Sequence, residues 1–116
     1  MSLIDQYIKV HIDYVAKFGK NTIVLCQTGS FYEVYAFSRD DWQMNVANEL
    51  LDLKIASKKS NNTSIFMCGF PDHAKARFEK KLLKNNYTVV YMEQSMDSQG
   101  KIQRNVTNVV SNGSNF

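Results

Sequence analysis

Apolar residues recur every three or four positions at the start of the chain, which predicts an amphipathic helix over residues 3–18. The apolar side of this helix holds Ile4, Tyr7, Ile8, Ile12, Val15 and Phe18. Charged residues fall on the other side, and Gly19 is placed to end the helix. We expect the helix to pack on a sheet or on a neighbouring domain.

The pattern then changes to that of strands. Residues 22–28 are apolar with almost no alternation, which predicts a central strand covered on both faces. Gly29-Ser30 marks a turn, and we expect residues 31–37 to form a second strand antiparallel to the first. Four further strands are predicted at residues 53–57, 65–70, 88–93 and 105–111. Residues 58–63 are expected to form an exposed loop, and residues 98–100 a hairpin-like connection.

Two more helices are predicted between these strands. Ser38 or Asp40 can cap a helix that runs to about Leu51. Pro71-Asp72 suits the first turn of a helix over roughly residues 72–85, because proline needs no N–H there and an acid is favoured. The inward positions of that last helix are Ala74, Phe78, Leu82 and Leu83.

The order of elements predicts the fold class. It is α-β-β-α-β-β-α-β-β, which indicates an α/β domain with a mixed, partly antiparallel sheet of about six strands and about three flanking helices. A length of 116 residues fits one domain. We expect residues 1–112 to form that domain and residues 113–116 to be a linker or the cut end of a longer chain.

Composition narrows the class of protein. Hydrophobic content of 44% and charged content of 22% are typical of a soluble globular protein, and no apolar run reaches the length of a membrane span. Cys26 and Cys68 lie in separate apolar runs, so we predict two buried free thiols in an intracellular, reducing compartment. The cysteines and histidines show no metal-ligand spacing.

Positive charge is concentrated in one part of the chain. Between Lys54 and Lys84 there are eight basic and two acidic residues, a net charge of +6, whereas the remaining residues carry −3. Such a segment is compatible with a surface that faces phosphate groups. A solvated helix face explains the same lysines equally well.

Phe31 and Glu33 are the candidate functional pair. Residues two apart in a strand project from the same side, so an aromatic ring and a carboxylate would emerge together. This pairing suits a protein that pushes a ring into a base stack and reads the displaced base with one polar group. The alternative is that Phe31 belongs to a core and Glu33 faces solvent.

Several chemistries lack their sequence signal. The chain has no P-loop, no Gly-x-Ser-x-Gly, no His-Glu-x-x-His and no paired-cysteine motif. Asp40, Asp41 and Glu49 could in principle hold magnesium, as in a small nuclease, although the two aspartates have the placement of helix-start residues. His73 has no partner acid or nucleophile nearby in sequence, which favours a structural role.

The chain resembles the N-terminal mismatch-recognition domain of the MutS DNA mismatch repair family. Residues 29–35 resemble that family's Gly-Asp-Phe-Tyr-Glu-Leu-Phe run, and residues 67–74 its Met-Ala-Gly-Ile-Pro-Tyr-His-Ala run. Residues 50–52 followed by Lys58-Lys59 are similar to its Leu-Leu-Asp…Lys-Arg segment, and residues 89–94 to its Cys-Glu-Gln strand. Arg104-Asn105-Val106 and residues 111–114 resemble its last strand and exit. The motifs occur in the same order and cover most of the chain.

The resemblance implies a function for particular residues. Phe31 would wedge into the duplex from the minor groove and stack on a mispaired base, and Glu33 would hydrogen-bond the same base. Lys58, Lys59 and Arg104 correspond to basic positions near the DNA backbone. The partners implied are double-stranded DNA with mismatches or small loops and, in the full-length protein, a MutS-like dimer partner. ATP and magnesium would bind an ATPase domain outside these residues, so the chain itself would hold no cofactor and no catalytic residue.

The chain departs from the family pattern at Ser30, Lys59 and Asp72, where the family usually has Asp, Arg and Tyr. Lysine keeps the charge of arginine but loses its bidentate phosphate geometry. Three alternatives therefore stay open: a protein-interaction module that keeps the fold without mismatch specificity, a small metal-dependent nuclease, and an unrelated α/β domain.

Overall fold

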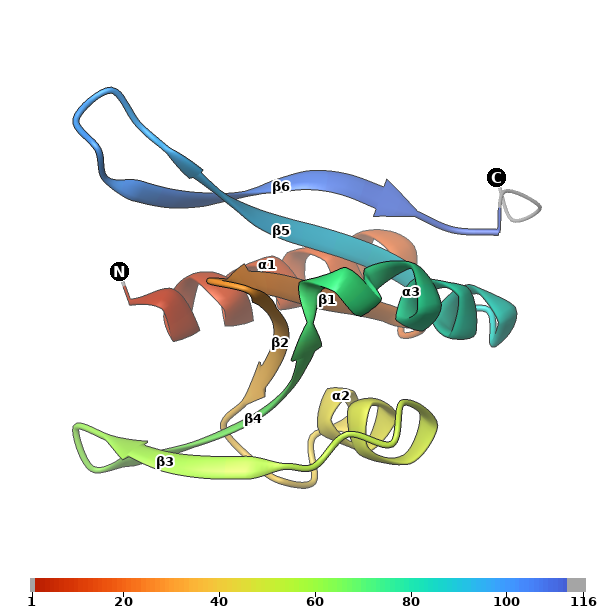
Figure 1. Cartoon of the computed structure of the whole chain (residues 1–116). Coiled ribbons are helices and arrows are strands. Elements are labelled where there is room, and N and C mark those ends of the chain that lie inside the picture. The colour runs from red at the N-terminus through yellow and green to blue at the C-terminus, as the bar shows by residue number, and fades with distance from the viewer. Residues whose placement is uncertain (1, 113–116) are drawn as a thin grey trace.

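The computed structural model describes residues 2–112, which form one six-stranded mixed sheet with three helical segments packed on it (Figure 1). The helical segments are α1 (Leu3–Phe18), α2 (Trp42–Asn45) continued by the π-helical η1 (Val46–Leu50), and the 3-10 turn η2 (Asp72–Ala74) continued by α3 (Lys75–Lys84). The strands are β1 (Thr22–Thr28), β2 (Phe31–Ala36), β3 (Ala56–Ser60), β4 (Thr63–Pro71), β5 (Thr88–Met96) and β6 (Ile102–Val110). Their order across the sheet is β3-β4-β2-β1-β5-β6. The predicted fold class is confirmed.

Helix α1 has the ends that its sequence predicts. The Ser2 side chain accepts a hydrogen bond from the Asp5 N–H at 3.1 Å, and Gly19 ends the helix in a backbone conformation with φ +100°. The helix is held to the sheet by Tyr7, which is fully buried and donates its hydroxyl to the Val24 carbonyl at 2.8 Å. A hydrogen bond of this kind satisfies the one polar atom of an otherwise apolar side chain.

Strand β1 lies at the centre of the sheet, as its unbroken apolar run predicts. It pairs antiparallel with β2 and parallel with β5, and its residues from Thr22 to Cys26 are buried. Helix α1 covers one face, whereas α2 and α3 pack on the other (Figure 1). On that second face the Met44 sulfur lies 3.9 Å from Cys68 Sγ, and the Phe78 ring stacks on Phe70 with centroids 4.2 Å apart.

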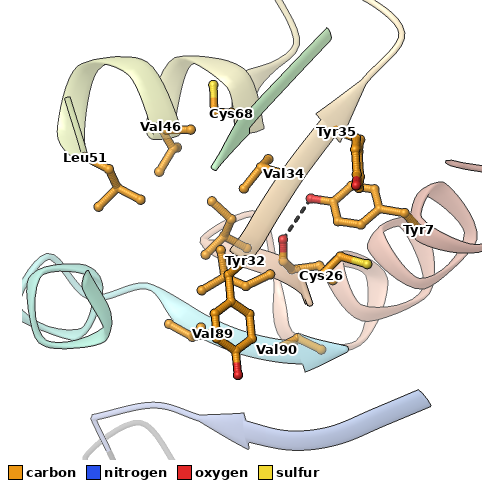
Figure 2. Close-up of a cluster of buried hydrophobic side chains, with 14 of the residues drawn as sticks. Tyr7, Cys26, Tyr32, Val34, Tyr35, Val46, Leu51, Cys68, Val89 and Val90 are labelled. Atoms are coloured by element: carbon orange, nitrogen blue, oxygen red, sulfur yellow. Dashed lines mark hydrogen bonds between the residues drawn. The ribbon is translucent and has the colours of Figure 1, made fainter. Parts of the chain in front are cut away.

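The two cysteines lie on opposite faces of the sheet. Cys26 is opposite Glu33 in the β1–β2 register, and Cys68 is opposite Val34 in the β2–β4 register. Neighbouring residues of a strand point to opposite faces. Figure 2 accordingly shows Cys26 near Tyr7 and Cys68 across the strand from it. Both thiols are buried and free, as predicted.

The predicted strand at residues 53–57 and loop at residues 58–63 are wrong in their bounds. Strand β3 covers Ala56–Ser60, so Lys58 and Lys59 belong to a strand, and the turn is Asn61-Asn62. Both asparagines have positive φ, +51° and +65°, which suits a tight hairpin turn between β3 and β4. A lysine-rich strand is acceptable here because β3 is an edge strand, where charge discourages pairing with other chains.

The second helix begins later than predicted. Ser38 and Asp40 lie in a turn in which the Asp40 N–H donates to Ser38 Oγ at 3.2 Å, and Asp41 occupies the position before Trp42. The helix then widens into η1. The predicted hairpin at residues 98–100 is confirmed, with Gly100 at φ +80°, but β5 and β6 are longer than the predicted runs 88–93 and 105–111. The predicted linker at residues 113–116 lies outside the described residues.

His11 is the buried titratable residue of α1. It is 9% exposed, lies between the rings of Tyr7 and Trp42, and among the described residues its Nδ1 is a buried polar atom without a hydrogen-bond partner. Burial lowers the pKa of His11 below its ordinary value of 6.5, and the nearby Asp41 carboxylate only partly opposes this. His11 therefore binds a proton less readily in the folded chain than in the unfolded chain.

We expect the free energy of unfolding to fall as the pH decreases below about 6.5, because His11 contributes its full stabilisation only above the unfolded pKa. The slope from this one proton is at most about 1.4 kcal/mol per pH unit. His11→Phe keeps a ring in the same place and should flatten the slope between pH 7 and pH 5 in urea denaturation. His73→Asn, at an exposed position, should keep it. An unchanged slope in His11→Phe would contradict the assignment.

Candidate nucleic-acid interface

The turn between β1 and β2 presents Phe31 at its tip. Gly29 has φ +58°, a left-handed conformation that glycine adopts without strain, and Phe31 then begins β2 opposite Thr28 and Pro71. The Phe31 side chain is 45% exposed, which is high for a phenylalanine in a sheet. The ring is therefore accessible to a partner without any rearrangement of the core.

Glu33 lies beside Phe31 on the face of the sheet that α1 covers. It is half-buried, and its carboxylate accepts a hydrogen bond from the Tyr35 hydroxyl. The Tyr35 hydroxyl also lies 3.3 Å from Thr28 Oγ1. Burial first, and then the bond to Glu33, raise the pKa of Tyr35 well above its ordinary value. Tyr35 therefore stays protonated and holds the Glu33 carboxylate as a hydrogen-bond donor.

Gly69 makes room for Glu33 on the neighbouring strand. It lies opposite Glu33 in the β2–β4 register, and a Cβ at this position would be 3.0 Å from Glu33 Cγ and 3.0 Å from the Tyr32 carbonyl oxygen. A glycine inside a strand often marks a close approach of this kind. The sequence contains that signal, but a role for Gly69 was not predicted from it.

The Phe31 turn is braced by hydrogen bonds from residues distant in sequence. The Gly29 N–H donates to Gln94 Oε1 at 3.3 Å, and Gln94 Nε2 donates back to the Gly29 carbonyl at 2.9 Å. The Asp72 N–H donates to the Ser30 carbonyl at 2.7 Å. These bonds satisfy the turn's backbone and fix the direction in which Phe31 leaves it.

Arg104 belongs to the same brace. It lies opposite Gln94 in the β5–β6 register, and its Nε donates to the Gln27 carbonyl at 2.8 Å. Arg104 is half-buried, so part of its guanidinium is already engaged by the protein. The structure therefore places the residue next to the Phe31 turn and gives it a supporting contact there.

The two lysines of β3 point to opposite faces. Lys58 is opposite Ile65 and Lys59 is opposite Ser64. Because Ile65 shares a face with Met67, which is opposite Tyr35, Lys58 lies on the face of Glu33 and Phe31 and Lys59 on the other. Lys58 and Tyr35 also line one cavity of about 460 Å³ at the first turn of α1. Only Lys58 therefore shares the face of Phe31 and Glu33, and it pairs with Ile65 at the opposite end of β4 from Pro71, the partner of Phe31.

The basic segment from Lys54 to Lys84 is not one surface. Helix α3 packs on the sheet through its Phe78 ring, which stacks on Phe70 of β4. This is the opposite face of the sheet from Phe31. The exposed cations of α3 are Arg77, Lys80, Lys81 and Lys84. The excess of positive charge in this part of the sequence is therefore divided between the two faces.

Glu93 anchors the start of β2 from the side opposite the Phe31 ring. Its carboxylate accepts from the hydroxyls of Tyr32 and Thr107 and forms an ion pair with Lys75 at 3.1 Å. Burial alone would raise the pKa of Glu93, but these bonds outweigh burial and hold the pKa below its ordinary value. Lys75 also lies 4.2 Å from the centre of the Tyr91 ring. Tyr32, between Phe31 and Glu33, is thereby fixed.

Residues 2–112 show neither a cluster of metal ligands nor a membrane-spanning helix. No group of three or more His, Cys, Asp or Glu side chains in this part of the chain could hold a metal ion. None of the helices described there has the length and apolar character needed to cross a bilayer.

Comparison with known proteins gives one consistent result. The family model of MutS domain I matches residues 2–116. The chain is 28% identical over 112 residues to the DNA mismatch repair protein MutS of Acholeplasma laidlawii, 32% over 114 residues to that of Petrotoga mobilis, and 33% over 112 residues to that of Lactococcus lactis. These matches cover 96%, 96% and 93% of this chain but only 12% of each relative.

Proposed function

The chain belongs to the MutS domain I family, and we propose that it recognises mispaired bases by inserting the Phe31 ring into duplex DNA while Glu33 hydrogen-bonds the displaced base. The observation that carries this proposal is the exposed ring on a braced turn with a carboxylate two residues away on the same face. A ring that is both accessible and held in one direction needs little ordering on binding.

Deformability of DNA explains how such a wedge selects mispairs. Unstacking a base step costs a few kcal/mol, and the cost is lower where pairing is already weak. Stacking a base on an aromatic ring returns about 1–3 kcal/mol. The balance therefore favours mismatches without reading a particular sequence.

Glu33 is acceptable beside a polyanion only if it makes a specific hydrogen bond. It can accept from a base N–H, or it can take a proton and donate to a ring nitrogen. Gly69 lets Glu33 lie close to β4 and Tyr35 engages Oε1, so we expect the other carboxylate oxygen to meet the base.

The rest of the proposal concerns a longer protein. The chain spans about an eighth of the length of the relatives it matches, and we propose that it is the N-terminal domain of a MutS-type protein that dimerises inside the cell. In that protein a separate ATPase domain binds ATP and magnesium, and this chain supplies DNA contacts but no catalytic residue. We expect the isolated chain to bind DNA weakly, since one domain offers few phosphate contacts.

Lys58 and Lys59 provide a matched pair to test which face meets the DNA. In the longer protein, Lys58→Ala should weaken binding to mismatched and matched duplexes alike and reduce the salt dependence by about one charge, because it removes a phosphate contact. Lys59→Ala changes the charge equally but on the other face, and it should have little effect. Fluorescence anisotropy at several salt concentrations measures both. Equal losses from the two variants would argue against a single DNA-binding face.

A further inference from the structure

The Tyr35 hydroxyl is the hydrogen-bond donor to the Glu33 carboxylate. It comes from the next residue on the same face of β2, it is buried, and it donates to Glu33 Oε1. Its ring meets the Tyr7 ring edge-on with centroids 5.2 Å apart, so packing against α1 fixes its position. The family run quoted above ends in phenylalanine at this position, which has no hydroxyl.

The direction of the hydrogen bonds follows from the atoms present. Tyr35 has one hydroxyl proton and uses it in the hydrogen bond that it donates to the carboxylate, so Thr28 Oγ1, 3.3 Å away, is left to donate to the Tyr35 oxygen. Thr28 lies opposite Phe31 in the sheet. The hydroxyls of Tyr35 and Thr28 thus connect Glu33 to the position on β1 that lies opposite Phe31.

We propose that Tyr35 is a positioning residue that holds the Glu33 carboxylate turned toward the DNA, so that Glu33 reads a mispaired base as a hydrogen-bond acceptor. This inference rests on the proposed function and adds a preference to it: bases that offer a ring N–H are favoured over bases that offer a ring nitrogen acceptor. The raised pKa of Tyr35 agrees, because the phenol remains a donor throughout the neutral range.

The physical reason is that a hydrogen bond to the charged form of a carboxylate favours that form. Without the hydroxyl this preference is lost, and Glu33 can also act as a donor to a base. The identity of residue 35 therefore decides which of the two hydrogen-bonding modes of Glu33 operates in this chain.

The first experiment needs no DNA. In proton NMR of this chain, the Tyr35 hydroxyl proton should give a resolved, slowly exchanging resonance, as expected for a buried bond to a carboxylate. The resonance should disappear in Glu33→Ala. Failure to observe a protected Tyr35 hydroxyl in the wild type would overturn the inference and leave the Phe31 wedge untouched.

The second experiment uses base analogues in the longer protein. The probes are duplexes with mispaired thymine or its difluorotoluene isostere, which lacks the ring N–H, and duplexes with mispaired guanine or 7-deazaguanine, which lacks the N7 acceptor. The wild type should lose roughly tenfold in affinity with the isostere and little with 7-deazaguanine. In Tyr35→Phe the first loss should shrink by at least threefold and the second should appear.

Tyr14→Phe is the matched control, since it removes a hydroxyl from a half-buried tyrosine of α1, away from Glu33. It should keep the wild-type pattern. An unaltered analogue pattern in a folded Tyr35→Phe protein would overturn the inference. If the wild type showed no preference for mismatched duplexes, the proposed function would be contradicted. The NMR experiment would still test the bond between Tyr35 and Glu33.

Discussion

Phe31→Ala is expected to abolish the preference for mismatched over matched duplexes in the longer protein and to leave matched-duplex binding nearly unchanged. The ring supplies the stacking term, about 1–3 kcal/mol, and this term exists only where the duplex opens. Phosphate contacts supply ordinary binding and do not involve Phe31. A preference of up to about a hundredfold should therefore fall to near one, measured by competition anisotropy with otherwise identical duplexes.

The chain offers a matched control for this experiment. Phe37 follows β2 at its other end and is 44% exposed, almost the same as Phe31 at 45%. Phe37→Ala removes an equal ring from a different place and should keep the preference. Neither variant should lower the free energy of unfolding by much, because both rings are partly in water. If Phe31→Ala kept its preference, the protein-interaction module would become the better account.

Of the substitutions that add a single methyl group near the site, Gly69→Ala should lower the free energy of unfolding most. The new Cβ would be 3.0 Å from the Tyr32 carbonyl oxygen and from Glu33 Cγ, within a paired strand that has no freedom to move away. Overpacking of this kind typically lowers the free energy of unfolding by about 1–3 kcal/mol. We expect mismatch preference to fall as well, since Glu33 is displaced. Urea denaturation and competition anisotropy measure the two effects.

A double variant separates the two contacts of Gly69. In Gly69→Ala with Glu33→Ala, the contact with Cγ is absent, and the contact with the Tyr32 carbonyl is the close one that remains. The destabilisation by Gly69→Ala should therefore be smaller in the Glu33→Ala background than in the wild type. Equal destabilisation in both backgrounds would show that the side chain of Glu33 does not fill the space beside Gly69.

Local patterns were sufficient for most of the elements. The helical spacing of residues 3–18, the apolar run of β1 and the glycine at position 29 each predicted an element within a residue or two of its observed bounds. These signals depend on neighbours in sequence, such as a cap or a side-chain period, which the chain carries with it.

The bounds of the edge strand β3 and the start of helix α2 were harder to predict from the sequence. Strand β3 is polar because it lies at the edge of the sheet, so its lysines looked like a loop. A strand with one neighbour does not need an apolar run, and the Asn61-Asn62 turn was the only local sign of its end. The late start of the helix at Trp42 likewise depends on the turn that precedes it.

The sequence alone placed Phe31 and Glu33 on one face and brought an aromatic ring next to an acid, because alternation in a strand is a local property of the backbone. The tertiary structure decided what surrounds them. Gly69 lies opposite Glu33 in the β2–β4 register, and the side chains of Gln94 and Arg104 bind the carbonyls of Gly29 and Gln27 across 65 and 77 residues of sequence. Whether Lys58 or Lys59 shares their face depends on the register of β3 with β4, which no local pattern specifies, since a shift of one residue would exchange the two.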